Sequence, residues 1–170
     1  VEAGFQLVGN LSWYWSIRGH LGEGRRWATL ALQMGDSATP SLRARALYVV
    51  GSLAWQQGDL FVARSLLEES IALHREVGTL PQKELGQALI ALAMVASYQT
   101  DHDVARDAAD EAVTMFRQLD DKWGFALALN PVAEACMMRH DYTAARSWFA
   151  ESLALFREVG DKWAIGIPLL

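Results

Sequence analysis

The chain has little cysteine, little proline and no long apolar run. Its single cysteine, Cys136, excludes an internal disulfide and suits a reducing cytoplasm. Hydrophobic residues make up 52% of the 170 residues, yet no run reaches the ~18 consecutive apolar residues that a membrane helix needs. The first residues also lack the basic and cleavable pattern of a signal peptide. We therefore expect a cytoplasmic protein without membrane contact.

Positive charge is also scarce. The chain has 15 Lys and Arg residues against 20 Asp and Glu residues, and its net charge of −5 is scattered along the sequence. That balance argues against direct nucleic-acid binding, which requires cationic contacts to phosphates. Helix-forming residues dominate and β-branched residues are few. The composition therefore predicts an all-α domain.

A motif recurs at a nearly fixed interval. The segment 63–73 returns, little changed, as 145–155, and a weaker copy occupies 105–113. Steps of about 40 residues are typical of solenoids, in which each repeat is one helix pair stacked on the next. We expect a single repeat domain that is a fragment of a larger protein. Its predicted units are 1–41, 42–82, 83–123, 124–163 and a partial fifth at 164–170.

Apolar residues recur at helical spacing within each unit, and short turns marked by aspartate separate the two helices of a unit. A small residue five positions after each turn, such as Ala63, is expected to let the two helices approach closely. The predicted first helices are Gln6–Arg18, Leu42–Gln57, Lys83–Gln99 and Lys122–Arg139. The predicted second helices are Gly22–Met34, Leu60–Val77, His102–Leu119 and Tyr142–Val159. Thr100 and His140 stand where the turn has glycine in other units, and Pro131 is expected to kink its helix.

The residues Leu47, Gly51 and Ala54, followed by Gly58-Asp59 and Ala63, resemble the tetratricopeptide (TPR) pattern. This resemblance implies a right-handed superhelical solenoid of antiparallel helix pairs. The long period and the segments 13–27 and 67–78 resemble the TPR arrays of bacterial STAND-class signalling ATPases and of LuxR-type, maltose-activator-like transcription regulators. By that resemblance, we expect a non-catalytic sensor without a cofactor, placed beside an ATPase domain.

TPR geometry implies that fixed positions of each first helix line a concave groove. The groove would hold a protein, a peptide or a small-molecule inducer. For each residue, packing between adjacent units is an equally open interpretation. The lining so implied is Trp13, Ile17, Arg45, Tyr48, Ser52, Trp55, Gln56, Gln87, Ile90, Met94, Tyr98, Asn130, Glu134, Met137 and Met138, with Gln6, Ser16, Ser97 and Leu127 beside them.

Residues that could carry chemistry form no recognisable set. The histidines His20, His102 and His140 fall at turns about one repeat apart, which favours solvated turn residues over a shared metal ion. Cys136 has His140 four residues on, so a thiolate–imidazole contact is geometrically allowed, but a small buried residue is the favoured interpretation. An enzyme therefore has little support.

Two further surfaces have open interpretations. Arg25-Arg26, with Arg18, either faces a neighbouring ATPase domain or another acidic partner, or is a solvated helix start. At the other end, Phe149, Leu153 and Phe156 are expected to lack a covering helix, and 165–170 to be apolar and sticky. We therefore predict a weak dimer that forms through this C-terminal end. The remaining functional alternative to a sensor is a constitutive scaffold that docks a protein partner.

Overall fold

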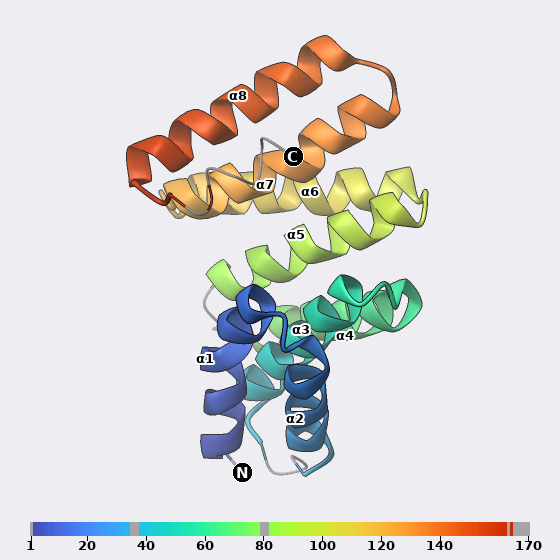
Figure 1. Cartoon of the computed structure of the whole chain (residues 1–170), viewed down its shortest axis with the longest axis vertical. Helices are drawn as coiled ribbons and strands as arrows, with labels where there is room; N and C mark the ends of the chain where they lie inside the picture. Colours follow the sequence, from blue (N-terminus) through green and yellow to red (C-terminus); the bar gives the residue numbers. More distant parts are fainter. Residues whose placement is uncertain (1, 35–37, 79–81, 163, 165–170) are drawn as a thin grey trace. The chain divides into compact units, whose positions relative to one another are not determined.

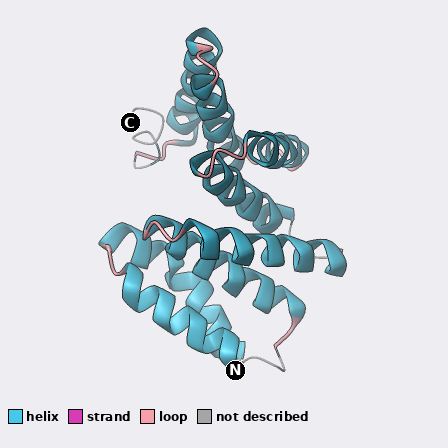
Figure 2. Cartoon of the chain, turned by 90° about the vertical axis from the view of Figure 1, so that its right-hand side faces the viewer, coloured by secondary structure: helices cyan, strands magenta, loops and turns pink. Residues whose placement is uncertain are grey.

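In a computed structural model that describes residues 2–34, 38–78, 82–162 and 164, the chain is helical (Figures 1 and 2). These residues contain no strand. The expected helix pairs are confirmed, with ends within a few residues of prediction. The helices are α1 (Glu2–Arg18), α2 (Leu21–Gln33), α3 (Pro40–Gln56), α4 (Leu60–Val77), α5 (Gln82–Tyr98), α6 (His102–Gln118), α7 (Lys122–Met138) and α8 (Tyr142–Val159).

The chain divides into two compact units, which are described separately. Unit 1 is Val1–Ala88 and contains α1 to α4 with the start of α5. Unit 2 is Leu89–Leu170 and contains the rest of α5 with α6 to α8. The single repeat domain expected from the sequence stays a prediction.

Unit 1 is held together by a close approach between helices. Helix α1 packs on α2 and α3, and α3 also packs on α2 and α4. A Cβ atom at Gly24 of α2 would lie 2.6 Å from Cδ2 of Trp15, so the buried Trp15 ring fits only over a glycine. The other repeats have Ala63, Ala105 and Ala145 at this position, all at most 2% exposed. The expected small residue between paired helices is therefore confirmed.

Unit 2 repeats this arrangement with α7 packed on α6 and α8. A Cβ atom at Gly124 would lie 2.2 Å from Cδ1 of Phe116, so α7 passes directly over that ring. Phe156 is fully buried in a cluster with Ala126 and Ala164. The expectation that Phe156 lacks cover is thus wrong, because α7 and Ala164 supply the covering atoms. The terminal segment 165–170, expected to be sticky, lies outside the described residues.

Aspartates start the second helices, as the turn pattern predicted. The side chains of Asp101 and Asp141 accept hydrogen bonds from Val104 N and Ala144 N at 3.4 and 3.1 Å. Asp59 is an exception, because its side chain makes no capping bond to α4. Its Oδ2 instead accepts a hydrogen bond from Nη2 of Arg25 at 2.7 Å. This ion pair joins the first two helix pairs.

The turns within pairs contain left-handed residues of two kinds. Gly19 and Gly58 have φ of 74° and 81°, and Thr100 and His140 have φ of 61° at the equivalent positions. The turn shape is therefore retained where glycine is replaced. A β-branched residue such as Thr100 is strained there, because its Cβ crowds the backbone.

Replacing Thr100 with glycine should raise the free energy of unfolding by about 0.5–1 kcal/mol, since relief of strain exceeds the added flexibility of the unfolded chain. Gly58→Thr should lower it by about 1–2 kcal/mol. Urea denaturation of both variants measures the changes. A destabilised Thr100→Gly variant would show that the Thr100 side chain is favourable in this turn.

Pro131 lies inside α7, which continues through it. Pro131 has no N–H, so the carbonyl of Leu127 loses its usual helical partner. Nδ2 of the buried Asn130 donates to that carbonyl at 3.2 Å and to the carbonyl of Ala126 at 3.2 Å. Oγ of Ser152 in α8 also donates to Ala126 O at 2.8 Å. Asn130 therefore repairs the hydrogen-bond gap that Pro131 creates.

Asn130→Ala should lower the free energy of unfolding by about 1–3 kcal/mol, because it leaves a buried carbonyl unpaired. In a Pro131→Ala background the same change should cost about 1 kcal/mol less, since the N–H of Ala at 131 can serve Leu127 O. A double-mutant cycle by chemical denaturation checks this. Equal costs in both backgrounds would contradict the compensation.

His74 of α4 occupies a position that belongs to the core. Phe116 and Phe156 stand at the equivalent place in later repeats and are fully buried. His74 is 3% exposed, and neither ring nitrogen has a hydrogen-bond partner among the residues that the structure describes. Burial lowers the pKa of His74 below its ordinary value of 6.5. The folded state therefore keeps the ring neutral.

Protonation of His74 in the unfolded state should make folding acid-sensitive. Below pH 6.5, roughly the pKa of a histidine in the unfolded chain, His74 binds a proton in the unfolded state but not in the folded state. The free energy of unfolding therefore falls as the pH is lowered. His74→Phe should stabilise the protein by about 1–3 kcal/mol at pH 7, and by more at pH 5. Thermal unfolding at both pH values tests this, and a stability gain that is independent of pH would refute it.

Candidate ligand-binding surface

The first helices of unit 1 expose several predicted groove residues. Trp13 and Ile17 of α1 are 48% and 46% exposed, while Trp55 of α3 is half-buried. Nε2 of Gln56 donates a hydrogen bond to Oγ of Ser16 at 3.0 Å, which joins the carboxyl ends of α1 and α3. The structure therefore presents aromatic and amide groups from two first helices of this unit.

Arg45 connects three helices of unit 1. Its side chain lies over Gly9 of α1, where a Cβ atom would approach Nε to 2.4 Å. Nη2 of Arg45 donates to Oδ1 of Asn10 at 3.3 Å, and Nε lies 3.6 Å from Oε1 of Glu84 in α5. Because both charged side chains keep a quarter to a third of their surface exposed, this pair can exchange its bonds for contacts with a polar ligand.

Tyr48 is next to this ion pair. Burial raises the pKa of Tyr48, and the Glu84 carboxylate raises it further, while the neighbouring Ser52 hydroxyl opposes both effects. The phenol therefore remains neutral and can act as a hydrogen-bond donor at physiological pH. Gln87 of α5 is half-buried in the same unit. These groups form a polar patch that we call the Arg45 cluster: Asn10, Arg45, Tyr48, Ser52 and Glu84.

The predicted groove residues of unit 2 differ in exposure. Tyr98 and Met138 are 61% and 58% exposed, whereas Ile90 and Met94 are half-buried. Met137 is 44% exposed but lines a hollow on α8, with Tyr142 and Phe149 among its neighbours. Exposed methionine and aromatic side chains suit adaptable apolar contacts.

Glu134 and Asn130 of α7 have different roles. Burial raises the pKa of Glu134, because its charged form loses hydration. Asn130 is 5% exposed and bonded within the α7–α8 pair, so it packs rather than lines a surface. For this residue the structure favours the packing alternative, and the signal that explains it in the sequence is the adjacent Pro131.

The histidine and cysteine residues that could carry chemistry do not gather into one site. Nδ1 of His140 lies 2.9 Å from the hydroxyl of Tyr142, while Cys136 is buried and interacts with Arg139 at 3.8 Å. Cys136 is thus the expected buried residue. Within the described ranges, no three His, Cys, Asp or Glu side chains gather as metal ligands. No helix in the described part of the chain is long and apolar enough to cross a bilayer.

Two surface hollows were not foreseen from the sequence. One, of about 490 Å³, lies along α2. The other, of about 480 Å³, lies along α8, where the partly exposed Phe149 and Leu153 help to line it. Their residues recur at helical spacing and look like ordinary amphipathic stripes, so the sequence carries no signal that distinguishes these stripes from packed ones.

Comparisons with known proteins agree with this architecture. Residues 42–118 match the model of the tetratricopeptide repeat. No curated protein matches the sequence. Among solved structures, the Rap protein complexed with competence and sporulation factor superposes with a TM-score of 0.85 at 14% identity, over 96% of this chain and 46% of that chain. The chain thus spans about half the length of that protein.

Two further structures have the same fold. BtubC (BKLC) from P. vanneervenii has a TM-score of 0.70 at 15% identity, covering 96% of this chain and 76% of that one. A kinesin light chain-like protein of Podosopora anserina with nearly identical TPR-like repeats has a TM-score of 0.71 at 13% identity, covering 93% and 77%. Together with the match over 42–118, these likenesses support a TPR-like array of helix pairs.

Proposed function

We propose that this chain is a non-catalytic binding module that holds a protein or peptide on its first helices. The observation that supports it most is the fold match over 96% of the chain to a Rap protein that is complexed with competence and sporulation factor. An array of this fold is therefore compatible with holding a regulatory factor. In unit 1 the exposed Trp13 and Ile17 supply apolar contact area and the Arg45 cluster supplies polar anchors, and in unit 2 the exposed Tyr98 supplies further apolar area.

The apolar and the charged side chains of this surface contribute to binding in different ways. Apolar side chains that are already exposed release water when a ligand covers them, which favours binding. The arginine and carboxylate of the Arg45 cluster are held by neighbours, so little conformational freedom is lost when they bond to a ligand. A peptide suits both, because its side chains offer apolar groups and its backbone offers hydrogen-bond partners.

We further propose that the module works as a sensor in a bacterial regulator beside an ATPase domain, with a small-molecule inducer as an alternative ligand. Binding would then shift the regulator between resting and active states only if the two states differ in ligand affinity. The competing proposal is a constitutive scaffold. A P-loop motif encoded in the same gene would favour the regulator, and a gene that encodes none would favour the scaffold.

A thermal-shift screen of peptides and small molecules against this chain tests the binding function. A ligand present at 100 times its Kd stabilises the folded state by about 2.7 kcal/mol, which raises the Tm by roughly 5–10 °C. Combining Trp55→Ala with Tyr98→Ala should remove that shift and leave the helical circular-dichroism spectrum intact.

Tyr142→Ala is the matched control, because Tyr142 is 62% exposed against 61% for Tyr98 but is not one of the predicted groove residues. It should retain the ligand-induced shift. A double variant that binds normally would place the ligand elsewhere. A double variant that unfolds would show that Trp55 and Tyr98 are core residues. The proposal that the first helices carry the binding surface would then be wrong.

A further inference from the structure

Glu134 is an isolated carboxylate in the first helices of unit 2. It is the only charged residue of α7 after Lys122, and the part of α5 that belongs to this unit has none. Lys122 is itself paired with Glu158 of α8. Within the described residues, Glu134 makes no hydrogen bond or ion pair. In the part of the chain that the structure describes, Glu134 is therefore a charge on these first helices that the fold does not pair.

The surroundings of Glu134 are apolar and only partly dry. The side chain is partly buried, and burial raises the pKa of its carboxyl group because the charged form loses hydration. Met137 and Met138 follow three and four residues later, at the spacing that places side chains next to each other on a helix. They are 44% and 58% exposed. A ligand can therefore reach the carboxylate and cover the two methionines together.

The repeat does not require a carboxylate at this position. Glu134 stands six residues before the left-handed turn residue, and the equivalent positions of the other first helices hold Trp13, Ser52 and Met94. None of these three side chains is charged. A partly desolvated carboxylate without a partner lowers the free energy of unfolding. Its presence at Glu134 therefore needs a reason other than folding.

The charge of unit 2 favours a positive ligand. Charged residues occur along the whole chain, but residues 1–88 contain eight Asp or Glu and eight Lys or Arg, whereas residues 89–170 contain twelve and seven. Unit 1 is therefore neutral by sequence, and unit 2 carries the whole net charge of −5. A cationic group is attracted as it approaches unit 2, and an acidic group is repelled.

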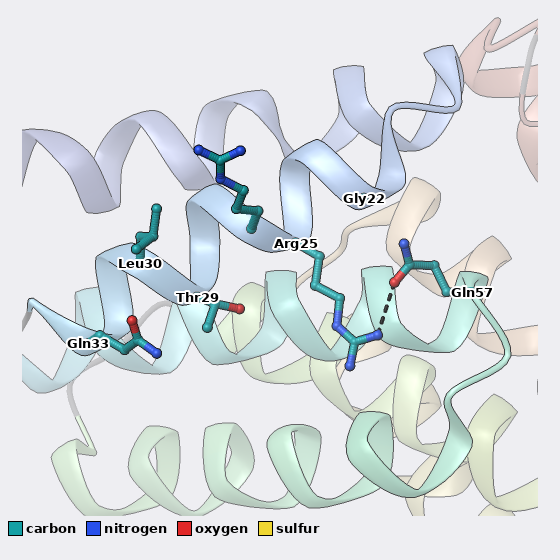
Figure 3. A pocket seen from close by; sticks show the side chains of 7 residues that line it. Gly22, Arg25, Thr29, Leu30, Gln33 and Gln57 are labelled. Carbon is teal, nitrogen blue, oxygen red and sulfur yellow. Dashed lines mark hydrogen bonds between the residues drawn. The ribbon is translucent and has the colours of Figure 1, made fainter.

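The charged hollow along α2 differs, because neighbours already satisfy its Arg25. In Figure 3, Arg25 reaches toward Gln57, and Nη1 of Arg25 donates to Oε1 of Gln57 at 3.0 Å. Nη2 of the same side chain lies 2.7 Å from Oδ2 of Asp59. Glu134 has no such partner among the described residues, so a ligand can supply one.

We propose that Glu134 binds the basic side chain of an arginine or lysine in the peptide that this module holds. The inference rests on the function proposed above and specifies its ligand as a peptide with a basic residue between apolar ones. The basic group bonds to the carboxylate, and the apolar neighbours cover Met137 and Met138. Arginine suits the site better than lysine, because a guanidinium is more weakly hydrated than an ammonium group and loses less on leaving water.

A phage-displayed library of randomised short peptides, selected on the complete chain, tests this specificity. Clones that fail to bind the variant with Trp55→Ala and Tyr98→Ala are those held by the first-helix surface, and they should share a basic residue flanked by apolar ones. For the best such peptide, fluorescence anisotropy should show Kd raised about tenfold or more by Glu134→Met. Replacing the peptide arginine with uncharged citrulline should raise Kd as much for the wild-type chain, but little for Glu134→Met.

Two controls separate a direct contact from other effects. Glu134→Met introduces the residue that stands at the equivalent place in α5, so the variant should unfold at the wild-type temperature or above. Glu151→Met removes the same charge from an exposed position on α8 of the same unit and should leave Kd unchanged.

Three results would overturn the inference and leave the proposed function standing: clones without a common basic residue, a Kd that Glu134→Met does not change, or an equal effect of Glu151→Met. A Glu134→Met variant that unfolds at a lower temperature would also overturn it, because the carboxylate would then have a structural role. If no clone depends on Trp55 and Tyr98, the proposed function itself fails, and this inference fails with it.

Discussion

Close contact between the two helices of each pair is the constraint on which the rest of the structure depends. It requires a small residue early in every second helix, and Gly24, Ala63, Ala105 and Ala145 meet that requirement in buried surroundings. The contact fixes how first and second helices face each other, and so determines which residues remain exposed. Glycine appears in the first repeat because the large Trp15 ring occupies the space that a methyl group would fill.

Much of this fold could be predicted from the sequence because the information is repeated. Helix ends follow from aspartates and left-handed residues, which act locally and recur at about 40-residue steps. Even Thr100 and His140 retain the turn, since the surrounding helices impose the backbone shape. The burial of Cys136 was equally foreseeable, because a small sulfur-containing residue on an apolar helix face packs well.

Individual binding residues were harder to predict, since exposure depends on neighbours that are distant in sequence. Asn130 was assigned to the groove by its repeat position, yet Pro131 beside it creates an unpaired carbonyl that its amide serves. Phe156 was expected at an uncovered end, but Ala126 and Ala164 bury it. The hollow on α2 depends on which side of an amphipathic helix is left without a neighbour, and periodicity alone does not report this.

Asp59 bonds to Arg25 and does not cap α4, and this has a consequence for how unit 1 unfolds. In a solenoid, stability divides into terms internal to each repeat and terms between neighbours. A capping aspartate contributes to its own helix, whereas Asp59 bonds to Arg25 of the preceding pair and leaves α4 uncapped by its side chain. Stabilisation is thus moved from inside one repeat to the junction of two. The first two helix pairs are thereby made more cooperative, because loss of α2 also removes the bond that Asp59 makes.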